Sequence, residues 1–80
     1  MTPELIWVFE KFVENFSIYT SFVTDDEGVL ICRFSIVRGD DILHVSRGFL
    51  AKSKEDAMEE IDRMVNDWIA NYTYCIDSVK

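Results

Sequence analysis

The chain has 80 residues with 15 acidic and 8 basic side chains, so its net charge is −7; 49% of its residues are hydrophobic and 14% aromatic. This length predicts one domain, residues 1–80, and the apolar content excludes a disordered chain. The negative charge argues against direct contact with nucleic acid or membranes and favours a basic partner. The longest apolar run covers residues 5–9, too short for a membrane span or a secretory signal, so we expect a cytoplasmic protein.

The first predicted element is an amphipathic helix over residues 3–16, because Pro3 suits a first helical turn and apolar residues follow at helical spacing. Those apolar residues are Leu5, Val8, Phe9, Phe12, Val13 and Phe16. Trp7 falls on the polar side of this helix, together with Glu14. Exposed tryptophan is uncommon and is enriched in binding hot spots. Trp7 and Glu14 are therefore candidate partner-binding residues, and the alternative for Trp7 is burial under the tail or under a second copy in a homodimer.

Three strands are predicted next, over residues 17–24, 29–38 and 42–50, because these segments are rich in β-branched and aromatic residues and are separated by Asp- and Gly-rich turns. Short turns predict an antiparallel meander with one buried and one wet face. The predicted buried side chains are Leu30, Cys32, Phe34, Ile36, Leu43, Val45 and Phe49. The predicted wet side chains are Tyr19, Ser21, Arg33, Ser35, His44 and Ser46.

The clearest periodic pattern predicts a helix over residues 53–72. Ser53 begins a stretch typical of a capping box, and a broad apolar stripe follows it. The opposite side is acidic, with a row formed by Asp56, Glu59, Glu60, Asp62 and Asp67. Like charges four residues apart on a helix are mildly destabilising. The acidic row is therefore a candidate recognition surface, and simple solubilisation is the alternative.

Together these elements predict an α+β domain with the order helix–three-stranded antiparallel meander–helix (α-β-β-β-α). Both helices are expected on the same face of the sheet, because that face alone offers apolar surface. A short tail, residues 73–80, completes the chain, and a strand within it is left open.

Catalytic and metal-binding patterns are weak. His44 and Ser46 share a predicted strand face, but they lack an orienting acid and an oxyanion hole. The acidic turns miss the spacing of a calcium loop, and Cys32 and Cys75 do not form a zinc motif. We therefore expect a protein that is not an enzyme, with no catalytic residue, no metal site and no cofactor.

The predicted topology over residues 3–72 resembles the double-stranded-RNA-binding domain, and the likeness is sharpest at Gly48 and Lys52–Met58. That family opens its second helix with lysines that contact RNA phosphates. Lys54 and Ala57 match this motif, whereas Glu55 and Met58 replace two of its lysines. The resemblance thus implies the fold used for protein–protein contacts or dimerisation in place of RNA binding.

The length, acidity and α+β organisation also resemble small phage-encoded inhibitors, including anti-CRISPR proteins. This resemblance implies a protein-binding inhibitor, acting in the host cytoplasm, that mimics nucleic acid and blocks a basic groove of a nucleic-acid enzyme such as a CRISPR nuclease. The acidic row would stand in for phosphates, with Trp7 as an apolar anchor. An RNA-binding-domain-like module for dimerisation or adaptor contacts is the alternative.

Overall fold

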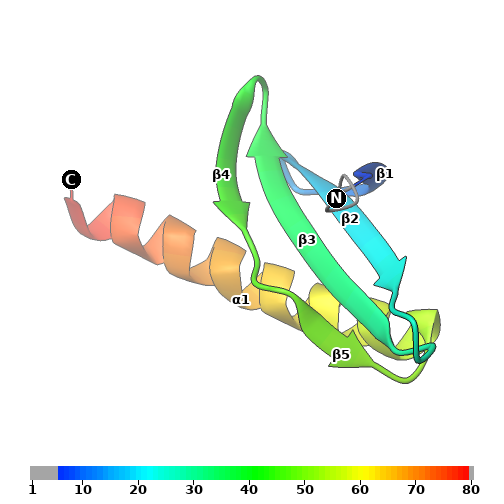
Figure 1. Ribbon diagram of the computed structural model, residues 1–80. Coiled ribbons are helices and arrows are strands. Elements are labelled where there is room, and N and C mark those ends of the chain that lie inside the picture. The colour runs from blue at the N-terminus through cyan, green and yellow to red at the C-terminus, as the bar shows by residue number, and fades with distance from the viewer. Residues whose placement is uncertain (1–5, 80) are drawn as a thin grey trace.

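A computed structural model describes residues 6–79 of the chain, with side chains for residues 6–72. It contains an antiparallel sheet and one long helix (Figure 1). The elements are β1 (Val8–Val13), β2 (Phe16–Thr24), β3 (Leu30–Arg38), β4 (Asp41–Val45), β5 (Phe49–Ala51) and α1 (Lys54–Val79). The strand order is β1-β2-β3-β4, and β5 pairs with the beginning of β3. The predicted helix–three strands–helix order is therefore wrong, because the described chain begins with a strand.

A β-bulge explains why the N-terminal segment was mistaken for a helix. In the pairing of β1 with β2, Phe9 lies opposite Tyr19 and Lys11 lies opposite Ile18, so Glu10 is an extra residue in β1. A bulge of this kind places two residues three apart on the same face of a strand. Phe9 and Phe12 have this spacing, which imitates the helical period. Residues 3–5 of the predicted helix lie outside the described residues.

The two central strands agree with the sequence prediction. β2 and β3 pair without interruption from Ser17 opposite Val37 to Thr24 opposite Leu30. The turn between them is closed by the Asp25 side chain, whose Oδ1 accepts hydrogen bonds from the backbone N–H groups of residues 27 and 29 at 2.9 and 2.8 Å. Gly28 has a φ of 86° there, which a glycine adopts at little cost.

The third predicted strand, residues 42–50, is two strands in the structure. β4 pairs with the end of β3 and β5 with its beginning. Ser46 lies between them and keeps the ladder satisfied, since its N–H donates to the Phe34 carbonyl and its Oγ accepts from the Phe34 N–H, both at 2.8 Å. The break therefore leaves no unpaired backbone group at Phe34.

A second bulge reverses the predicted faces of β4. Ile36 lies opposite His44 and Val37 lies opposite Ile42, so Leu43 is the extra residue. From His44 onward the alternation is shifted by one, and a shift of one residue moves each side chain to the other face. The prediction placed His44 on the wet face and Val45 in the core, and both assignments are wrong.

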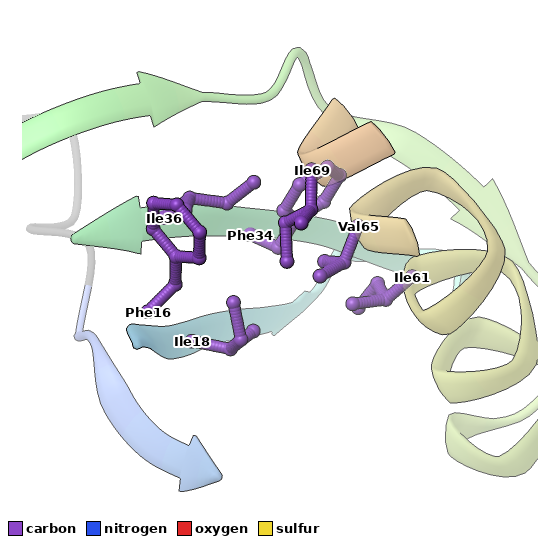
Figure 2. Close-up of a cluster of buried hydrophobic side chains, with 7 residues drawn as sticks. All are labelled: Phe16, Ile18, Phe34, Ile36, Ile61, Val65 and Ile69. Atoms are coloured by element: carbon purple, nitrogen blue, oxygen red, sulfur yellow. The ribbon is translucent and has the colours of Figure 1, made fainter. Parts of the chain in front are cut away.

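The core lies between α1 and one face of β2 and β3 (Figure 2). Figure 2 shows side chains of the two strands directed at side chains of the helix. The buried cluster consists of Phe16, Ile18, Phe34, Ile36, Ile61, Val65 and Ile69. This apolar stripe at helical spacing fixes which side of α1 contacts the sheet.

Helix α1 begins where the sequence indicates and continues further than predicted. Ser53 Oγ accepts a hydrogen bond from the Asp56 N–H at 3.2 Å, which is an N-cap. The helical backbone continues to Val79, so residues 73–79 are helical and form no strand. Its C-terminal turns, orange to red in Figure 1, extend beyond the sheet.

Candidate protein-interaction surface

The sheet has a second face, opposite α1, that no other element of the described chain covers. We call it the open face. The strand registers place two rows of four side chains across it. One row is Phe12, Ser17, Val37 and Ile42, and the other is Phe9, Tyr19, Ser35 and Val45.

The open face has the shape of a trough, because Ser17 and Ser35 lie at two of its central positions between larger side chains. Ser35 is only 7% exposed although no layer covers it, because larger neighbours shield it. The walls remain accessible: Phe12 is 70% exposed, Ile42 68% and Val45 52%. Contiguous exposed apolar surface of this kind is typical of an interaction site.

A hollow of about 490 Å³ lies within this trough, and Trp7 is one of its walls. The other lining residues are Tyr19, Ser35, Val37, Ile42 and Val45. Extending the β1–β2 register by one residue places Trp7 opposite Ser21, which is 1% exposed. Ser21 Oγ makes no hydrogen bond within the described part of the chain. Trp7 is half-buried and contributes to an apolar surface instead of standing on the polar side of a helix.

The aromatic wall is held in place by contacts among its own members. Phe9 packs edge-to-face against Phe12 with ring centroids 5.0 Å apart, and against Tyr19 at 5.6 Å. Such contacts add to simple apolar burial and restrict side-chain rotation. The wall therefore loses little side-chain entropy when a partner covers it.

Charge is unevenly distributed between this surface and the rest of the molecule. No carboxylate occupies the two rows, although the chain carries 15 acidic residues. The next pair along the two central strands on this face is Ser21 and Arg33, and Arg33 is charged. Its guanidinium lies against Gly48, where an added Cβ would come within 3.0 Å of Nη2. The two rows thus form an uncharged area on a strongly acidic protein, with Arg33 beside them.

The predicted acidic row lies on α1, away from the open face, and the chain itself neutralises part of it. Asp62 forms an ion pair with Lys11, and Glu60 pairs with Arg63. The other members, Asp56, Glu59 and Asp67, are exposed and make no ion pair within the described residues. The structure therefore does not bring the acidic row together with Trp7 in one site.

Glu14, the remaining predicted binding residue, occupies the turn between β1 and β2. Its φ of 55° puts a non-glycine residue in the left-handed region, which is uncommon outside turns. It lines a separate hollow of about 380 Å³ beside α1, together with Val13, Asn66, Ile69 and Ala70. Glu14 lies on no helix in this structure, so its predicted neighbourhood with Trp7 on a helical face is wrong.

The groups considered for chemistry lie on the helix side of the sheet. His44 packs between aromatic rings, with its centroid 5.6 Å from Phe34 and 5.9 Å from Trp68. Cys32 is fully buried and unpaired, and burial raises the pKa of its thiol above the ordinary value of 9.0. Among the side chains of residues 6–72, no three His, Cys, Asp or Glu gather as a metal site would require. The side chain of Cys75 lies outside the described part.

Comparison with protein-family models, curated proteins and solved structures found no match to this chain. The observed topology differs from the helix–three strands–helix order on which the resemblance to the double-stranded-RNA-binding domain rests. None of the described helical residues form a segment with the length and apolar character needed to cross a membrane.

Sequence reasoning missed most of the open face, including Phe9, Phe12, Ile42 and Val45. One signal could have indicated it. On the predicted wet face of residues 29–38, Ile31 and Val37 accompany Arg33 and Ser35, so both faces of this strand are partly apolar. A strand with apolar residues on both of its faces is typically covered on both sides.

Proposed function

We propose that this chain is a protein-binding domain without catalytic activity of its own, and that the open face is its contact surface. The observation that carries the proposal is the trough: exposed aromatic and aliphatic walls around a shielded serine floor, on a face that α1 leaves bare. Protein interfaces have such an apolar centre surrounded by a polar rim. The exposed acidic turns at the ends of the strands supply the rim, and a cytoplasmic location is part of this proposal.

The geometry favours a protein over a small molecule as the bound species. Small-molecule sites enclose most of the ligand surface in a cleft. Here the hollow is open along the sheet, and its walls continue into Phe12 and Phe9, which do not line it. A large, flat and apolar partner surface would contact all of these residues together.

Site-specific photo-crosslinking tests this proposal. Benzoylphenylalanine replaces Phe12 on the open face or, as the control, Val8, which is 54% exposed and pairs with Thr20 on the helix side of the sheet. Irradiation in cell extract should give adducts of higher mass from position 12 and few from position 8. Equal yields from the two positions would contradict the proposal.

A second candidate function is the acidic inhibitor that blocks a basic groove of a nucleic-acid enzyme. Three exposed carboxylates that make no ion pair within residues 6–72, on Asp56, Glu59 and Asp67, favour it. The ion pairs of Glu60 and Asp62 reduce the charge available for mimicry, and Trp7 cannot serve as anchor from the other side of the sheet. This candidate therefore needs the acidic residues alone to supply recognition.

The two candidates respond differently to charge reversal and to salt. Glu59→Lys should abolish binding through the acidic row, and added salt should weaken that binding because exposed charges are screened. Neither change should weaken contact through the open face, which buries apolar surface. Binding that is lost in Glu59→Lys and kept when Val45 is replaced by Asp would identify the acidic row as the functional surface.

A further inference from the structure

The open face is an apolar surface that no other element of the described chain covers, and the proposed function assigns it to a protein partner without saying which. The inference that follows rests on that proposed function and names the partner. We infer that the open face binds a second copy of this chain, so that two sheets pack face to face with the two α1 helices on the outside.

The exposed apolar side chains of the open face support this inference. Phe12 is 70% exposed, Ile42 68%, Val45 52% and Phe9 43%, and the strand registers place all four on this one face. A standard interface buries roughly 800 Å² on each partner, and these side chains supply apolar surface for such a contact.

Charge favours a second copy over a basic partner at this particular surface. A face adapted to a basic protein would carry carboxylates, and the two rows that cross the open face carry none. Two open faces can therefore meet without burying an acidic group, which would be costly. The helical acids, on the opposite side of each sheet, would end up on the two outer surfaces of the dimer and far from each other.

The arrangement of layers also favours a second copy, because one sheet with one helix is half of a helix–sheet–sheet–helix architecture. One sheet covered by one helix leaves an apolar face that is usually buried against another layer. Two twisted sheets pack about 10 Å apart with side chains of the facing surfaces interdigitated. A twofold axis can place the Ile42 and Val45 wall of each copy in the trough of the other, since each copy presents both a wall and a floor. The resulting order of layers is helix, sheet, sheet, helix.

A matched pair of substitutions tests the inference. Val45 and Val8 are the same residue type with nearly equal exposure, 52% and 54%, but they lie on opposite faces of the sheet. Val45→Asp puts a carboxylate on the open face of both copies. Truncating or burying charge at an interface typically weakens association strongly, here by on the order of a hundredfold. Val8→Asp applies the same chemical change outside the proposed contact and should leave association unchanged.

The measurement is particle mass by sedimentation equilibrium over a concentration series, with far-UV circular dichroism to confirm folding. Wild type and Val8→Asp should reach twice the 9.4-kDa chain mass, and Val45→Asp should stay monomeric over the same range. If Val45→Asp fails to fold, Ile42→Lys replaces it, because Ile42 is 68% exposed and its side chain is not needed for the core. Added salt should maintain or strengthen the dimer, because it screens repulsion between two acidic chains.

Two results would overturn the inference: a wild-type chain that remains monomeric at the highest concentration attainable, or a dimer that persists in Val45→Asp. The first result together with crosslinks from position 12 to a different protein would leave the proposed function standing and refute only the identity of the partner. The absence of any crosslink from position 12, in a monomeric wild type, would refute both.

Discussion

The two faces of the sheet are built from the same central strands, yet they differ in what covers them and in what they bury. The helix side holds a sealed cluster in which Ile18 and Ile36 have no exposed surface. The residues between these on the same strands point to the open face, which presents exposed aromatic and aliphatic walls around serines. Since the backbone is shared, the comparison separates side chains that stabilise the fold from side chains that are available for binding.

The largest expected effect is the difference between a phenylalanine on each face. Phe34 is 2% exposed in the core, and Phe12 is 70% exposed on the open face. Phe34→Ala should lower the free energy of unfolding by about 3–5 kcal/mol, because it removes buried surface and leaves a cavity. Phe12→Ala should change it by less than about 0.5 kcal/mol. Urea unfolding, at protein concentrations too low for association, measures the free energy of unfolding of both variants. Equal losses of stability would mean that the open face is part of the core.

A smaller effect is expected from two neighbouring buried hydroxyls. Thr20, on the helix side, donates a hydrogen bond to Glu10 Oε1 at 2.7 Å, whereas Ser21 Oγ has no partner in the described chain. Thr20→Val should cost about 1–2 kcal/mol, because Glu10 loses its partner. Ser21→Ala should be close to neutral or stabilising, because it removes an unpaired polar group. Chemical denaturation of both variants checks this, and a costly Ser21→Ala would show that its hydroxyl is satisfied in solution.

The smallest effect concerns the buried thiol of the helix side. Burial raises the pKa of Cys32 in the folded chain, so the folded state holds this proton at a pH where the unfolded state releases it. Stability is therefore unaffected below the ordinary thiol pKa and falls as the pH rises above it. In a Cys75→Ser background, Cys32→Ala should remove this part of the decline between neutral and alkaline pH. Identical slopes with and without Cys32 would contradict the buried position.

Much of the fold could be predicted because several local signals agree. The uninterrupted pairing of β2 with β3, the turn at Asp25–Gly28 and the Ser53 cap of α1 each follow from residue types at fixed spacing. α1 is long and strongly periodic, which makes its apolar face visible from sequence. These elements also determine the core, so the helix side of the sheet was largely predictable.

The open face could not be predicted, and two bulges are the physical reason. Each inserts a single residue, Glu10 in β1 and Leu43 in β4, and so reverses the alternation beyond it. The first made a strand look helical, and the second exchanged the predicted faces of His44 and Val45. A bulge depends on pairing with a neighbouring strand, so periodicity within one segment does not report it. For this reason the sequence pattern does not indicate the open face and indicates the acidic row of α1 instead.

Hydroxyl-radical footprinting over a range of protein concentrations reports side-chain exposure in solution, and so tests whether the open face is the binding surface. We expect Trp7, Phe12 and Tyr19 to be labelled in dilute protein and to become protected as the concentration rises. Phe34 should stay unlabelled throughout, and the pattern in Val45→Asp should remain that of dilute protein. Labelling of Phe12 that is independent of concentration and of added partner, or protection that appears only along the acidic row of α1, would contradict the claim that the open face is the binding surface.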